Sequence, residues 1–93
     1  MFSRDLRDAL ARGEITVSIR RWSRPQVKVS GRYVSAGVVI EIDSLELLPF
    51  SAVTDDDVRD SGERDREALR ERAAHSGPIN DRTLVYRIEF HLV

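Results

Sequence analysis

The stretch "RTLVYRIEFHLV", residues 82–93, constrains the fold of this chain more than any other segment. Apolar and polar residues alternate along it. The apolar set is Leu84, Tyr86, Ile88, Phe90 and Leu92. Because successive side chains of a strand point to opposite faces of a sheet, the pattern predicts a strand with one buried face. We expect Tyr86 and Phe90 to lie in the core.

Further strands are predicted upstream. Residues 15–20 alternate in the same way and are rich in β-branched side chains. Residues 37–50, "GVVIEIDSLELLPF", give the longest strand signal, and the phase of their apolar positions changes near Asp43 and Ser44. That change predicts a β-bulge in a bent strand. Residues 27–33, "VKVSGRY", fit either a short strand with a turn or a loop around Gly31.

Short helices flank these strands. A first helix is expected over residues 4–13, with Ser3 as its cap and Gly13 as its stop. Thr54 is expected to cap a second helix, which Ser61 and Gly62 interrupt. A third helical run covers residues 63–75. This order predicts one α+β domain over residues 1–93, with a small, curved, mostly antiparallel sheet or partial barrel and short flanking helices.

Composition sets limits on function. Ninety-three residues with 41% hydrophobic and 33% charged content are typical of a small soluble globular domain. No apolar run approaches the roughly 20 residues of a membrane helix, and the N-terminus is charged from Arg4, so we expect a cytoplasmic protein without membrane contact. With no cysteine there is no disulfide framework, thiolate metal site or cysteine nucleophile.

No cofactor or metal is expected either. The sequence has no P-loop, no zinc-ligand spacing and no dinucleotide-binding glycine pattern. Asp55, Asp56 and Asp57 are consecutive, and consecutive helix residues diverge around the axis. These three carboxylates therefore fit the start of a helix better than a metal site.

Charge is distributed unevenly although the net charge is only −1. Residues 15–40 contain five basic and no acidic residues, whereas residues 41–67 contain ten acidic residues and three arginines. Two interpretations stay open: the segments are solvated faces that partly neutralise each other, or the basic one is a functional patch.

The segment "GEITVSIRRW", residues 13–22, is the strongest candidate for such a patch. In a strand, Ile15, Val17 and Ile19 would face the core. The opposite face would carry two hydroxyls, a guanidinium and an indole, from Thr16, Ser18, Arg20 and Trp22. These groups suit a phosphate or the edge and face of a base. The alternative is a solvent-facing side of the sheet with Trp22 folded onto the core.

The same segment resembles the signature of the ASCH domain family, a short helix followed by Gly-x-Lys-x-x-[Thr/Ser]-x-Arg. Here "GEITVSIR" supplies Gly13, Ser18 and Arg20. The later "PFSAVTDDDVRDSGERDREAL" and the closing "LVYRIEFHLV" are similar to further parts of the family pattern. The resemblance implies a PUA-like β-barrel, a cleft between the signature strand and the acidic helical segment, and association with RNA or modified nucleosides.

Some small members of that family are amidohydrolases of N4-acetylcytidine, with a proposed lysine, threonine and glutamate in the site. Ser18 matches the threonine, Glu63 is the counterpart of the glutamate, and Ile15 occupies the lysine position. Isoleucine cannot take a proton from a serine hydroxyl, so this position lacks the activating group that the family's hydrolases are proposed to use. Glu63 could act as a general base, or it could simply be a carboxylate at a helix N-terminus.

The leading hypothesis is therefore a module that binds RNA or a nucleoside-like ligand. Its expected ligand-binding residues are Thr16, Ser18, Arg20, Arg21 and Trp22. One alternative is an amide hydrolase with Ser18 and Glu63 in its catalytic site. Another is a protein-interaction module that uses the arginines and Trp22, since both residue types are common interface anchors.

Overall fold

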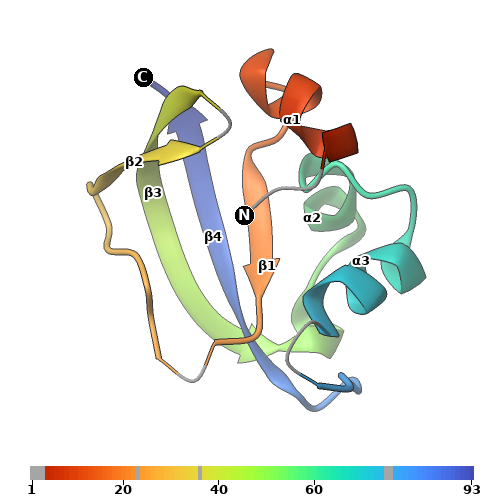
Figure 1. The fold of residues 1–93 in the computed structure, drawn as a ribbon. Helices are drawn as coiled ribbons and strands as arrows, with labels where there is room; N and C mark the ends of the chain where they lie inside the picture. Colours follow the sequence, from red (N-terminus) through yellow and green to blue (C-terminus); the bar gives the residue numbers. More distant parts are fainter. Residues whose placement is uncertain (1–3, 23, 36, 75–76) are drawn as a thin grey trace.

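The computed structural model describes residues 4–22, 24–35, 37–74 and 77–93. Its centre is an antiparallel four-stranded sheet in the order β1-β4-β3-β2, curled into a half-barrel (Figure 1). The strands are β1 (Val17–Arg20), β2 (Arg32–Ser35), β3 (Val38–Pro49) and β4 (Leu84–Leu92). The predicted α+β fold with a small, curved antiparallel sheet is confirmed.

The long strands β3 and β4 form the middle of the sheet. Their register shifts between Ile42 and Ser44, which makes Asp43 the extra residue of a β-bulge, where the apolar phase of the sequence changes. Tyr86 and Phe90 of β4 are buried as predicted. Leu84 is exposed because it pairs with Pro49 at the last rung of the sheet.

The helices are short and have recognisable ends. They are α1 (Arg4–Ala11), α2 (Asp55–Asp60) and α3 (Arg66–Ala73), and a 3₁₀ turn, η1, covers Phe50–Ala52. Thr54 caps α2 by accepting a hydrogen bond from the Asp57 N–H. α3 begins three residues later than the predicted start at residue 63, because the Asp65 side chain accepts from the Ala68 N–H and caps the helix there. The predicted cap Ser3 and the end of the third run at His75 lie outside the described residues.

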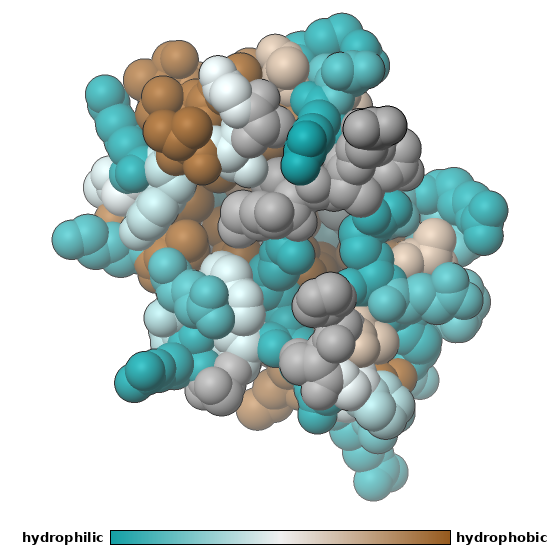
Figure 2. Space-filling view, in the orientation of Figure 1, coloured by the Kyte–Doolittle hydropathy of each residue, from teal (hydrophilic) through white to brown (hydrophobic). Residues whose placement is uncertain are grey.

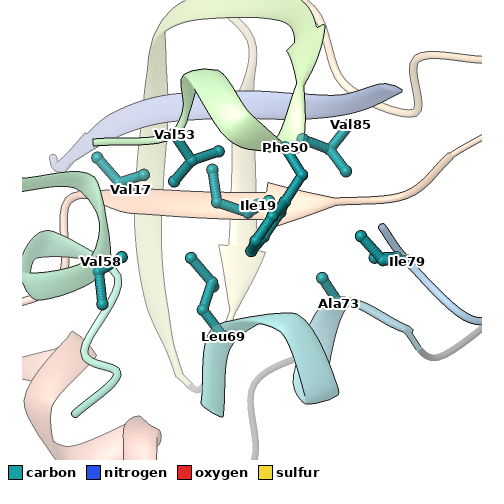
Figure 3. Close-up of a cluster of buried hydrophobic side chains, with 9 residues drawn as sticks. All are labelled: Val17, Ile19, Phe50, Val53, Val58, Leu69, Ala73, Ile79 and Val85. Carbon is teal, nitrogen blue, oxygen red and sulfur yellow. The ribbon is translucent and has the colours of Figure 1, made fainter. Parts of the chain in front are cut away.

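Two apolar clusters cover opposite faces of the sheet. The first lies between β1, β4 and the helices α2 and α3, with the ring of Phe50 at its centre (Figure 3). The second lies on the other face and includes Leu6 and Leu10 of α1 together with Ile88 and Phe90 of β4. Ile15, Val17 and Ile19 are all core residues, as predicted, but Ile15 belongs to the second cluster.

Hydrophobic and hydrophilic residues occupy different parts of the visible surface (Figure 2). Hydrophobic residues gather over the end of the sheet where β2 lies and β4 finishes, and hydrophilic residues cover the α2 and α3 side (Figure 2). Val34 of β2 is 77% exposed, and its strand partner Val39 is also exposed. Among the described residues, no helix has the length and apolar character needed to cross a bilayer.

Candidate functional site

A pocket lies between β1 and the segment that joins α2 to α3, and we call it the Ser18 pocket. Its polar lining residues are Ser18, Arg20, Ser61, Glu63 and Arg72. Leu6, Leu69 and Ala73 supply apolar walls. The enclosed volume is about 20 Å³, which is enough for one water molecule or one small polar group.

Ser18 and Arg20 reach the pocket from β1. They are two residues apart on a strand, so they share a face, and Arg20 Nε donates a hydrogen bond of 2.9 Å to Ser18 Oγ. The side chain of Ser18 is buried. The N–H of Thr16 donates to the carbonyl of Asp60 at 2.9 Å, which ties the start of this strand to the end of α2. This backbone contact sets the distance between the strand and the α2–α3 segment.

Glu63 enters the pocket from the α2–α3 segment. Gly62 has φ +83° and turns the chain directly before it. A side chain at Gly62 would come within 2.9 Å of Ile15 Cδ1, so the turn is packed closely against the residue at the lysine position of the signature. The Glu63 side chain is 6% exposed and forms an ion pair with Arg72 Nε of α3.

The charged side chains that line the Ser18 pocket have a net positive charge. Arg20 and Arg72 bring two guanidinium groups, and Glu63 brings one carboxylate. Burial lowers the pKa of Arg20, and the positive charge of Arg72 lowers it further. Guanidinium forks next to a hydroxyl suit an anionic or carbonyl-bearing group, and the carboxylate adds an acceptor for an N–H donor.

A larger open groove adjoins the pocket and shares Glu63 and Arg72 with it. Gly62, Arg64, Ala68 and Glu71 complete its lining. Its volume is about 520 Å³, within the range of small-molecule sites. The combination is a small polar recess that opens into a groove of ligand size.

The structure brings together three of the predicted site residues, Ser18, Arg20 and Glu63. Thr16, Arg21 and Trp22 do not line the Ser18 pocket. Trp22 is half-buried against the second apolar cluster. Its ring centroid lies 5.9 Å from that of Tyr86, so the alternative in which Trp22 folds onto the core describes its position. The roles of these three residues in ligand binding stay predictions.

Arg72 and Ser61 line the pocket but were not among the predicted site residues. Arg72 lies in the run "REALRERA" of α3, which contains three arginines and reads as an ordinary solvated helix. Its position depends on where α3 begins, and Asp65 sets that start. Ser61 donates to the carbonyl of Val58 at 2.7 Å, as serine often does at a helix end, and nothing local distinguishes it.

One group of possible metal ligands lies elsewhere. Glu41 and Asp43 of β3 and His91 of β4 place their ligand atoms within 4.8 Å of one another. None of the three lines the Ser18 pocket. Glu41 and Asp43 are two residues apart, but His91 lies far from both in the sequence, so ligand spacing could not reveal the set.

Comparison with known proteins identifies the fold. No protein-family profile matches the sequence, and no curated protein matches it. The crystal structure of an ASCH domain from Lactobacillus crispatus JV V101 superposes with a TM-score of 0.73, covering 95% of this chain and 70% of that chain at 21% identity. At this identity the likeness concerns the fold and not a shared activity. The chain therefore has the fold of an ASCH domain, as the resemblance of its signature segment predicts.

Proposed function

We propose that this chain is a binding module that holds an RNA segment or a modified nucleoside at the Ser18 pocket and its adjoining groove. The observation that carries the proposal is the convergence of Ser18 and Arg20 from one strand with Glu63 and Arg72 from the helical segment. It is supported by the ASCH fold, in which the signature strand forms one wall of the expected cleft.

The size of the pocket limits what can enter it. A volume of about 20 Å³ admits one amino, carbonyl or phosphoryl oxygen group but not a whole base. In our proposal an edge of the ligand enters the pocket, and the rest lies in the groove of about 520 Å³. Glu63 would accept a hydrogen bond from an exocyclic amine, while Arg20 and Arg72 would donate to a carbonyl or phosphate oxygen.

Ser18 supplies the remaining polar group. Its Oγ accepts a hydrogen bond from Arg20, which leaves the hydroxyl hydrogen for an acceptor on the ligand. Arg21 and Trp22 follow Arg20 directly and are proposed as flanking contacts, with Trp22 using the part of its ring that the core does not cover.

Trp22 is the only tryptophan in the sequence, so intrinsic fluorescence reports on one position. The test is a titration of the protein with cytidine, N4-acetylcytidine and a short single-stranded RNA while Trp22 emission is followed. We expect a saturable change with at least one of them. Arg72→Met should weaken that binding about tenfold or more, because it removes a charged donor from the pocket.

Arg24→Met is the matched control, since Arg24 is exposed, lies in the basic segment over residues 15–40 and does not line the pocket. It should bind as the parent does. Equal losses in the two variants would show that general charge, and not the pocket, carries the affinity. No binding of any of the three probes would overturn the proposal.

An amide hydrolase is the second candidate, because Ser18 and Glu63 line the same pocket. In this scheme Glu63 takes a proton from a water, and the water oxygen attacks the acetyl carbonyl of an acylated nucleobase. Arg20 then stabilises the oxyanion, the C–N bond breaks, and Glu63 returns the proton to the leaving amine. Two observations favour binding over turnover. The lysine position is occupied by the buried side chain of Ile15, and the carboxylate of Glu63 is already paired with Arg72.

Analysis of the titrated N4-acetylcytidine samples for acetate separates the two functions. Release of acetate that Glu63→Gln abolishes would establish the hydrolase. Saturable Trp22 quenching without acetate would support the binding module alone.

A further inference from the structure

We propose that Glu41, Asp43 and His91 form a binding site for a divalent transition-metal ion such as zinc. One imidazole nitrogen and one oxygen from each carboxylate lie within 4.8 Å of one another. In this proposal Nε2 of His91 and Oε2 of Glu41 bind the ion, and Asp43 orients the imidazole through Nδ1. This set shares no residue with the Ser18 pocket, so the proposal stands independently of the proposed function.

The sheet itself brings the three side chains together. Glu41 and His91 are direct partners in the β3–β4 ladder, so their side chains lie side by side on one face. Asp43 is two residues beyond Glu41, at the bulge, where the ladder is locally interrupted. The bulge thus holds a second carboxylate next to the same imidazole.

Each nitrogen of His91 faces a different carboxylate. Nδ1 lies 2.8 Å from Asp43 Oδ1, which is a hydrogen-bond distance. Nε2 lies 3.7 Å from Glu41 Oε2. A carboxylate on one ring nitrogen commonly orients the other nitrogen toward a metal. A tetrahedral ion with bonds of about 2.0–2.2 Å holds two of its ligand atoms about 3.4 Å apart. The distance between His91 Nε2 and Glu41 Oε2 therefore needs to shorten by only a few tenths of an ångström to admit the ion.

The surroundings favour a cation at this position. Arg32 Nε donates to Glu41 Oε1 at 3.0 Å, which holds this carboxylate with its other oxygen directed at His91. Two carboxylates outweigh the one guanidinium when the imidazole is neutral. His91 and Asp43 are exposed, so an ion can enter from solvent and complete its shell with water.

The donor set also discriminates among ions. Imidazole nitrogen suits zinc, copper and nickel, whereas magnesium and calcium prefer oxygen ligands alone. A bound ion would join β4 to β3 through His91 and Glu41 and stabilise the folded chain by mass action.

Isothermal titration of the full, tag-free chain with zinc chloride tests the site. We expect one ion per chain, no comparable heat with magnesium, and an affinity at least tenfold weaker in His91→Ala. Asp43→Asn should weaken zinc binding about 10- to 100-fold, because Asp43 orients the imidazole. His75→Ala is the control for adventitious histidine binding and should leave the affinity unchanged.

Circular dichroism of each variant checks that it is folded, and a zinc-dependent rise in melting temperature gives a second measurement. Failure of the parent chain to bind zinc would overturn the proposal. So would equal affinity in the parent and His91→Ala, and in either case His91 would serve only as an ion-pair partner between two carboxylates.

Discussion

Asp57 illustrates how one side chain joins two parts of this fold. Its Oδ2 accepts from the Thr54 N–H at 3.1 Å, and its Oδ1 accepts from Arg87 Nε of β4 at 2.8 Å. Burial raises the pKa of Asp57, but the hydrogen bonds from Thr54 and Arg87 and the charge of Arg87 outweigh burial. The pKa of Asp57 therefore lies below its usual value, and the ionised form stabilises the contact between α2 and the sheet.

The lowered pKa of Asp57 predicts how the stability of the fold changes in acid. An unfolded aspartate titrates near pH 3.9, so above about pH 5 Asp57 is ionised in both states and its contribution is complete. As the pH falls through the lower folded-state pKa, the unfolded chain binds the proton first and the contribution is lost. Asp57→Asn should therefore lower the free energy of unfolding at pH 7 and flatten its decline between pH 5 and pH 2, as measured by urea unfolding.

Asp56→Asn is the matched comparison, because the side chain of Asp56 is 78% exposed one position away. It should retain the acid dependence of the parent chain. An unchanged slope in Asp57→Asn would contradict the assignment of this effect to Asp57.

The elements were predictable to different degrees. The bulge in β3 followed from the change of apolar phase at Asp43 and Ser44, and the α2 cap followed from Thr54, because both signals are local. The sheet order β1-β4-β3-β2 was not predictable, since it depends on pairing between distant segments. Arg72 was missed for the same reason: only the packing of α3 against β1 turns its side chain into the Ser18 pocket.

The turn between α2 and α3 places Glu63 in the Ser18 pocket, and its backbone conformation depends on Gly62. Gly62 has φ +83°, and a Cβ added there would lie 2.9 Å from Ile15 Cδ1. Gly37 has φ +80°, and a Cβ added there would meet nothing within 4 Å. Gly37→Ala should cost about 1 kcal/mol of stability from backbone strain alone. Gly62→Ala should cost about 1–3 kcal/mol more, because the new methyl group must displace Ile15 or Leu6.

Chemical denaturation of the two glycine variants measures this difference. Because the turn also carries Glu63, we expect weaker ligand binding in Gly62→Ala than in Gly37→Ala. Equal free energies of unfolding in the two variants would mean that the close packing around Gly62 contributes nothing.

At the scale of the whole molecule, charge limits how RNA can be bound. The net charge is −1, and the arginines that line the Ser18 pocket and its groove are Arg20, Arg64 and Arg72. Single-stranded nucleic acid gives a slope of log affinity against log salt of about −0.7 per neutralised phosphate, so we expect a slope no steeper than about −2. Fluorescence anisotropy of a labelled RNA over a salt series provides the measurement. A slope steeper than about −4 would indicate an extended phosphate track and would count against a local pocket.

The position of β4 in the sheet has a consequence for synthesis. β4 lies between β1 and β3, yet it is the latest of the four strands in the chain. During translation β1 has no strand partner until residues 84–92 have been made, and the β2–β3 hairpin waits for the same segment. A ribosome that stalls before Leu84 would thus present two unjoined halves with uncovered apolar faces, a state that chaperones and proteases recognise.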